Sequence, residues 1–269
     1  MRVVGGLLLL TSCCAFGQGT VARPEFEVAD IKLNKTGDNN GSGTILPSGQ
    51  FRAVNIPIKE LIKFAYNVRD ENIIGAPAWI DSERYDVVGK AAPVGVEEIF
   101  WRSTNVVQVM HISYNWDETF RQMAQTLLAD RFKLVVHQEE RPLNVYALVI
   151  ARGGEKLKQA ADSGRPDCTR SVVPVIEAEA VCRNMTIANL AQALQVLAPG
   201  YANRNVVDLT GLKDTYDFTI TWVGRDVSDQ EGGLTIPDAL EKQLGIKMEG
   251  RRMPVSVIIV DHIERPSEN

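Results

Sequence analysis

The chain has 269 residues, a formal net charge of −5, 45% hydrophobic residues and 23% charged residues. This composition is typical of a folded globular protein and excludes a disordered or collagen-like chain, and the length suits one large domain or two small ones. The acidic balance argues against electrostatic binding of nucleic acid, because neutralising phosphates needs a concentration of Lys and Arg. No apolar run reaches about 18 residues, the length needed to span a bilayer.

Residues 1–17 have the pattern of a secretory signal peptide. Arg2 follows the first Met, residues 3–10 are apolar, and small residues lead to Gly17. Cleavage after Gly17 would leave Gln18 at the N-terminus of an extracytoplasmic protein, either periplasmic or secreted. An alternative is an uncleaved segment that forms a buried N-terminal strand.

A second export signal overlaps the first. The segment Leu10–Cys13 reads Leu-Thr-Ser-Cys, which fits the Leu-x-small-Cys pattern of a bacterial lipoprotein signal. Cys13 would then be lipidated and retained, and this lipid anchor would be the only contact with a membrane.

The first elements beyond this leader are a strand and a polar loop. Alternating apolar residues predict a strand over 23–35, and a Gly- and Asn-rich loop follows at 36–44. The next strand covers 50–55, and Pro57 then begins a helix. The apolar positions of that helix follow the i, i+3, i+4, i+7 spacing at Ile58, Leu61, Ile62 and Ala65.

The same order of elements recurs later in the chain. The helix spacing returns at Ile187, Leu190, Ala191 and Leu194. Tyr85-Asp86 and Tyr216-Asp217 each open a strand, and Pro142 and Pro254 each precede a strongly apolar one. Both stretches therefore predict β-α-β-β-α-β-β, over 51–151 and 181–264. The fold class is α+β, two tandem units with mixed sheets and helices packed on one face. The alternative is a chance likeness between two amphipathic stretches.

These patterns divide the mature chain into three parts. The first unit covers 24–151 and includes an insertion at 93–116, a linker covers 152–180, and the second unit covers 181–265. Two cysteines remain after the leader, Cys168 and Cys182, and an even pair in an exported protein predicts a disulfide. A redox-active or metal-binding thiol pair is the alternative, but the C-x-x-C spacing is missing.

Several segments together resemble an uncharacterised exported family that is expanded in soil Acidobacteria. They are Phe26–Lys32, Ile56–Tyr66, Pro77–Asp86, Leu128–Leu134, Val207–Leu212 and Val260–Ser267. The resemblance implies an extracytoplasmic domain of unknown function, and no catalytic residues come with it. Some relatives follow membrane zinc-peptidase sensor modules, which implies sensing or scaffolding. Each half is also similar, more weakly, to the short N-terminal domain of secretins and TonB-dependent receptors, which docks protein partners.

The insertion at 93–116 departs from the family pattern. It carries Phe100, Trp101, Tyr114 and Trp116, which we expect to form a partner-binding surface. The alternative is a loop that folds back on the sheet.

The usual catalytic signatures are missing. The sequence has no G-x-S-x-G, no H-E-x-x-H and no P-loop, so we assign no catalytic residue, no cofactor and no metal. Carboxylates near the strand openings could serve a glycosidase-like hydrolase. They are Asp81, Glu83, Asp86, Asp208 and Asp217. Their recurrence in both units favours a structural task, such as capping a turn.

We therefore expect an exported, non-enzymatic binding or interaction module of the bacterial cell envelope, with an envelope protein as partner and no nucleic acid. One alternative is a carboxylate-dependent hydrolase of an envelope or extracellular polymer. Another is a small-ligand sensor that uses a groove between the two units.

Overall fold

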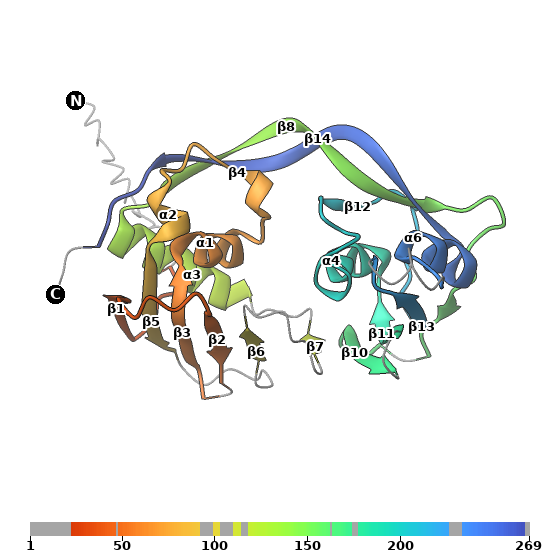
Figure 1. The fold of residues 1–269 in the computed structure, drawn as a ribbon, viewed down its shortest axis with the longest axis horizontal. Coiled ribbons are helices and arrows are strands. Elements are labelled where there is room, and N and C mark those ends of the chain that lie inside the picture. Colours follow the sequence, from red (N-terminus) through yellow and green to blue (C-terminus); the bar gives the residue numbers. More distant parts are fainter. Residues whose placement is uncertain are drawn as a thin grey trace, which may run out of the picture.

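Two long antiparallel strands, β8 (Val135–Ile150) and β14 (Ile246–His262), pair along their length and join two lobes (Figure 1). The computed structural model describes residues 23–46, 48–91, 99–102, 110–113, 118–161, 163–173, 177–225 and 233–266. The fold is α+β, with mixed sheets and helices. The expected leader and Cys13 lie outside the described residues.

The first lobe contains a five-stranded antiparallel sheet in the order β1-β5-β3-β2-β6. Helices α1 and α3 lie between this sheet and the β8–β14 ribbon (Figure 1). The elements of this lobe are β1 (Val28–Leu33), β2 (Ser42–Ile45), β3 (Gln50–Pro57), α1 (Ile58–Tyr66), η1 (Asp70–Asn72), β4 (Ile73–Ile74), α2 (Trp79–Ser82), β5 (Arg84–Lys90), β6 (Ile99–Arg102) and α3 (Glu118–Phe132).

The second lobe is built in the same way. Its five-stranded sheet has the order β7-β10-β11-β13-β9, and helices α4 and α6 lie between that sheet and the ribbon. The elements of this lobe are β7 (Met110–Ser113), β9 (Lys158–Gln159), β10 (Asp167–Val173), β11 (Glu177–Met185), α4 (Ile187–Leu197), β12 (Val206–Asp208), β13 (Tyr216–Val223), α6 (Ile236–Ala239) and the π-helical turn η2 (Leu240–Leu244).

In the ribbon, each long strand pairs with a short strand from the opposite half of the chain. Strand β4 of the first lobe pairs in parallel with β14, which follows the second lobe in the chain. Strand β12 of the second lobe pairs in parallel with β8, which follows the first. Pro142 and Pro254 are register partners in the ribbon. Each half of the chain therefore supplies the strand that the other half needs to complete its packing.

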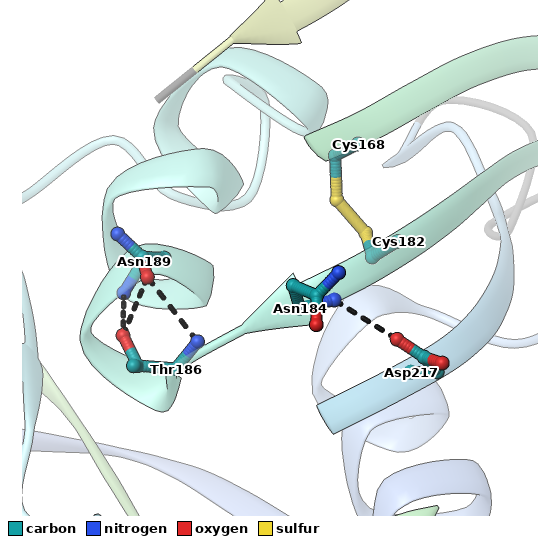
Figure 2. Close-up of a disulfide and its surroundings, with 6 residues drawn as sticks. All are labelled: Cys168, Cys182, Asn184, Thr186, Asn189 and Asp217. Atoms are coloured by element: carbon teal, nitrogen blue, oxygen red, sulfur yellow. Dashed lines mark hydrogen bonds between the residues drawn. A yellow bond between two sulfur atoms is a disulfide. The ribbon is translucent and has the colours of Figure 1, made fainter. Parts of the chain in front are cut away.

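Each lobe has its own hydrophobic core, and the ribbon reaches both. Ile258 and Val260 of β14 are buried in the first core beside Phe51 and Phe132, whereas Leu148 of β8 is buried in the second. The first helix of each half is placed as its spacing predicts, because α1 buries its four periodic apolar residues and α4 buries its own. Helix α4 begins at a capping box between Thr186 and Asn189 (Figure 2).

The end of each half differs from the predicted pattern. Two final strands were expected in each, but the structure has one continuous strand, β8 or β14. Lys133 adopts a left-handed conformation with φ 53°, so α3 ends there and the strand begins at Val135. Prolines did not interrupt these strands because each strand has an unpaired edge at the centre of the ribbon, where a missing N–H costs little.

The predicted linker at 152–180 is also structured in part, because β9 and β10 lie in the second sheet. The structure contains the expected disulfide between Cys168 and Cys182 (Figure 2). The two cysteines are directly opposite each other on β10 and β11. Because β10 pairs with β11, it belongs to the sheet of the second lobe and is not a linker.

The insertion at 93–116 contributes one strand to each sheet. Strand β6, which carries Phe100 and Trp101, pairs with β2, and β7 pairs with β10. Tyr114 and Trp116 lie outside the described residues. The partner surface that we expect at these four aromatic residues stays a prediction.

A candidate ligand site between the lobes

The carboxylates that recur in both halves hold the backbone. Asn55 and Asn184 have φ of 55° and 51°, at irregularities in β3 and β11. The N–H of Asn55 donates to Asp86 Oδ1 at 2.8 Å, and the N–H of Asn184 donates to Asp217 Oδ1 at 2.9 Å (Figure 2). Each Asp therefore accepts the backbone hydrogen bond that the irregular strand leaves free.

The other candidate carboxylates also have partners. Asp81 forms an ion pair of 2.7 Å with Lys59, and Glu83 forms one of 2.6 Å with Arg265. Asp208 Oδ1 accepts hydrogen bonds from the backbone N–H and hydroxyl of Thr210, at 2.9 and 2.7 Å. Each of the five candidate carboxylates therefore has a hydrogen-bond or ion-pair partner within the protein, which suits a structural role.

A cavity of about 410 Å³ lies between the lobes, and both contribute to its wall. Its most common side chain is the carboxamide, which both donates and accepts hydrogen bonds. The carboxamide residues are Asn67, Asn72, Gln138, Gln192, Gln195 and Asn205. We call this cavity the amide compartment.

Hydrogen bonds tie the two lobes together around the amide compartment. Arg69 Nη1 donates to Gln195 Oε1 at 2.8 Å, and Asn205 Nδ2 donates to Asn72 Oδ1 at 3.0 Å. Asn72 Nδ2 in turn donates to the carbonyl of Ser256 on β14 at 2.9 Å. By contrast, the side chains of Gln138 and Gln192 form no hydrogen bond within the described part of the chain, and both residues are exposed, so their amides are accessible to a ligand or to water.

An apolar cavity of about 310 Å³ adjoins the amide compartment, and the two share Asn67, Arg121 and Val196. The rings of Phe51 and Phe64 stack in its wall with centroids 6.3 Å apart. The remaining lining residues of this apolar compartment are Ile56, Glu60, Leu61 and Lys63. Val196 comes from α4 of the second lobe and is 42% exposed, so the apolar compartment also uses both lobes.

Arg121 of α3 lies where the two compartments meet. Its side chain is 17% exposed, and the nearest carboxylate oxygen, of Glu118, is 3.8 Å from its Nη1. Its buried Nε has no hydrogen-bond partner in the described structure. Burial lowers the pKa of Arg121, because removing a guanidinium from water disfavours its charged form. The Arg121 guanidinium is therefore a partly desolvated cation with unused donors.

The other basic residues of the two compartments have close acidic partners. Lys63 lies 2.9 Å from carboxylate oxygens of both Glu60 and Asp70, and Arg69 lies 2.7 Å from Glu71. Their charges are balanced locally, which leaves Arg121 as the basic residue best placed to receive an anion.

Sequence reasoning suggested a groove between the units but named none of its residues. Arg121 follows Phe120 on the predicted second helix, and no motif distinguishes it from an ordinary surface arginine. One signal was available, because Asn72 and Asn205 each stand directly before a short strand, β4 or β12. That recurrence matches the two residues that meet between the lobes.

Two searches of the described residues bear on other kinds of site. No group of three or more His, Cys, Asp or Glu is placed to hold a metal ion among them. In that same part of the chain, no helix is both long enough and apolar enough to cross a membrane.

Comparison with known proteins gives a family but no function. No curated protein and no solved structure matches the chain significantly. A family model matches residues 59–263, which is most of the chain and takes in the second lobe, the ribbon and the part of the first lobe that follows β3. The chain therefore belongs to the family described as "protein of unknown function (DUF3738)".

Proposed function

We propose that this protein is an exported, non-enzymatic binding module of the cell envelope that takes a small ligand between its two lobes. The observation that carries the proposal is the pair of adjoining compartments, whose walls come from both lobes and meet at Arg121. Binding sites of this kind are concave and mostly apolar, with a few polar groups that orient the ligand.

The location rests on two features of the chain. The N-terminal pattern is that of a secretory or lipoprotein signal. The Cys168–Cys182 disulfide fits the oxidising conditions outside the cytoplasm. The partner would be an envelope protein that docks at the 93–116 insertion and distinguishes the ligand-bound protein from the free one.

The hydrolase alternative receives less support from the geometry. A carboxylate-dependent glycosidase needs two carboxyl groups about 5–9 Å apart across the scissile bond. Of the described residues that line the two compartments, Glu60 is the only carboxylate, and it lies 2.9 Å from Lys63. This arrangement favours binding over two-carboxylate hydrolysis.

A cavity-filling variant tests the proposal. The mature protein would be incubated with a small-molecule extract of bacterial envelopes, desalted and examined by native mass spectrometry. We expect an adduct of defined mass that Val196→Trp abolishes, because the indole would fill the junction of the compartments. Val28→Trp is the matched control, since Val28 is 63% exposed on β1 and outside both compartments. Absence of an adduct, or an equal adduct on Val196→Trp, would contradict the proposal.

A further inference from the structure

We infer that the ligand is the C-terminal end of a short peptide whose last residue is apolar, with its free carboxylate on Arg121. This inference rests on the proposed binding function and adds the chemical class of the ligand. Three features of the site carry it: the charge of Arg121, the apolar compartment on one side of it and the carboxamides on the other.

The first step is the sign of the ligand's charge. The Arg121 side chain is 17% exposed, its Nε has no partner in the described structure, and Glu118 approaches no closer than 3.8 Å. A partly desolvated guanidinium without a close carboxylate gains a charge-assisted hydrogen bond when an anion reaches its terminal nitrogens. The planar fork of a guanidinium matches a carboxylate in a two-point hydrogen bond, so a carboxylate suits this position.

The second step is what lies beside the carboxylate. The wall of the apolar compartment contains Arg121 together with Leu61 and the stacked rings of Phe51 and Phe64. Its volume of about 310 Å³ accommodates one aromatic or branched aliphatic side chain. The side chain of a terminal residue branches from the carbon next to its carboxylate, so both groups reach their sites together.

The third step is the other side of Arg121. Peptide units carry one N–H donor and one carbonyl acceptor each, and carboxamide side chains complement both. Gln138 and Gln192, from the ribbon and from α4, face the amide compartment with no other hydrogen bond in the described structure. The peptide bonds that precede the terminal residue would extend along them. A simple fatty acid would form no hydrogen bond with these two exposed side chains.

Matched peptides test the inference by isothermal titration calorimetry. N-acetyl-Ala-Ala-Phe would be compared with the same peptide ending in a carboxamide, and with N-acetyl-Ala-Ala-Glu. We expect the free acid ending in Phe to bind at least about tenfold more tightly than either, because a charge-assisted pair and apolar burial are both needed. This comparison uses the unaltered protein, so it does not depend on how a variant folds.

Variants then locate the carboxylate. Arg121→Gln should remove the preference for the free acid over the amide, and Arg121→Lys should retain part of it. Arg131→Gln is the matched control, since Arg131 lies on the same helix, is exposed and is outside both compartments. Equal binding of acid and amide, or an acid preference that survives in Arg121→Gln, would overturn the inference.

The outcomes separate this inference from the proposed function. If none of the peptides binds, or acid and amide bind equally, while envelope extract still gives an adduct that Val196→Trp abolishes, the ligand class is wrong and the binding function stands. If neither the peptides nor the extract gives binding that Val196→Trp abolishes, both fail.

Discussion

Asp86 accepts two hydrogen bonds at its Oδ1 atom, one from the backbone N–H of Asn55 and one from the side chain of Asn34, both at 2.8 Å. Asn55 is 4% exposed, and its left-handed conformation takes its N–H out of the regular β3–β5 pairing. Without the carboxylate, a buried backbone donor would have no partner. Asp86 therefore acts on stability rather than on chemistry.

Replacing Asp86 tests this role. We expect Asp86→Ala to lower the free energy of unfolding by about 1–3 kcal/mol, the usual cost of leaving a buried donor unpaired. Asp86→Asn keeps an acceptor oxygen and should lose less. Urea denaturation would measure both. Asp30→Ala is the control, because the Asp30 side chain is 46% exposed and its ion pair with Lys32 lies at the surface, so little change is expected. A loss no larger than that of the control would contradict the role of Asp86.

Glu83 gives a second prediction for a single residue, which concerns how the free energy of unfolding depends on pH. The hydrogen bond from Arg265, and then that from Tyr85, hold the pKa of Glu83 below its ordinary value of 4.5. A lowered pKa in the folded state means that the stabilisation is present above the unfolded value and is lost as pH falls through the folded one. Glu83→Gln should therefore be less stable than the wild type at neutral pH.

The difference in free energy of unfolding between the wild type and Glu83→Gln should narrow below about pH 4.5, as Glu83 becomes protonated. Urea midpoints measured at neutral pH and at about pH 3 would show this convergence. Glu25→Gln is the control, since Glu25 is exposed in the N-terminal segment. A constant gap at all pH values would show that the Arg265 contact does not depend on the charge of Glu83.

At the scale of elements, the disulfide decides how β10 is held. Cys168 is fully buried and Cys182 is 1% exposed, and both belong to the second core. Without this bond, β10 would depend on its pairing with β11 and β7. The covalent link therefore holds the segment expected as a linker in the sheet.

Removing the disulfide should destabilise the protein measurably. The bond spans 14 residues, and the chain-entropy model gives a loss of about 3 kcal/mol for a loop of that size. We expect the double variant Cys168→Ala with Cys182→Ala to unfold at lower urea concentration than the oxidised wild type. Dithiothreitol should shift the wild type by a similar amount and leave the variant unchanged. A variant as stable as the oxidised protein would refute this account.

At the scale of the whole molecule, the β8–β14 ribbon makes the lobes depend on each other. Leu148 comes from the strand that follows the first lobe, yet it is fully buried in the second core. Ile258 comes from the strand that follows the second lobe and is buried in the first. We expect neither half to reach full stability without the other.

Two core variants test this coupling. Leu148→Ala and Ile258→Ala should each lower the free energy of unfolding by about 2–5 kcal/mol, and each should weaken both lobes together. Hydrogen exchange of α1 and α4 in urea would report the lobes separately. Val135→Ala, at a ribbon residue that is 53% exposed, is the control. A loss of protection confined to one lobe would show that the lobes unfold independently.

Much of the local structure follows from the order of residues. The spacing of Ile58 to Ala65 and of Ile187 to Leu194 specifies α1 and α4, because a helical period places these side chains on one face. The cysteine pair in an exported chain predicted the disulfide. The helices depend on residues a few positions apart, and the disulfide prediction depends on the number of cysteines. The duplication of one unit stays a prediction, although the two halves share their element order.

The exchanged ribbon and the candidate site were decided only by tertiary structure. Strand pairing between segments far apart in the chain leaves no period in the sequence, so β4 and β12 could not be assigned to strands of the opposite half. The same pairing brings Arg121 of α3 next to Val196 of α4. The composition, the first helix of each half and the disulfide thus follow from the sequence itself. The cavity follows from long-range contacts, because a concave surface shared by two lobes exists only after both have packed against one ribbon.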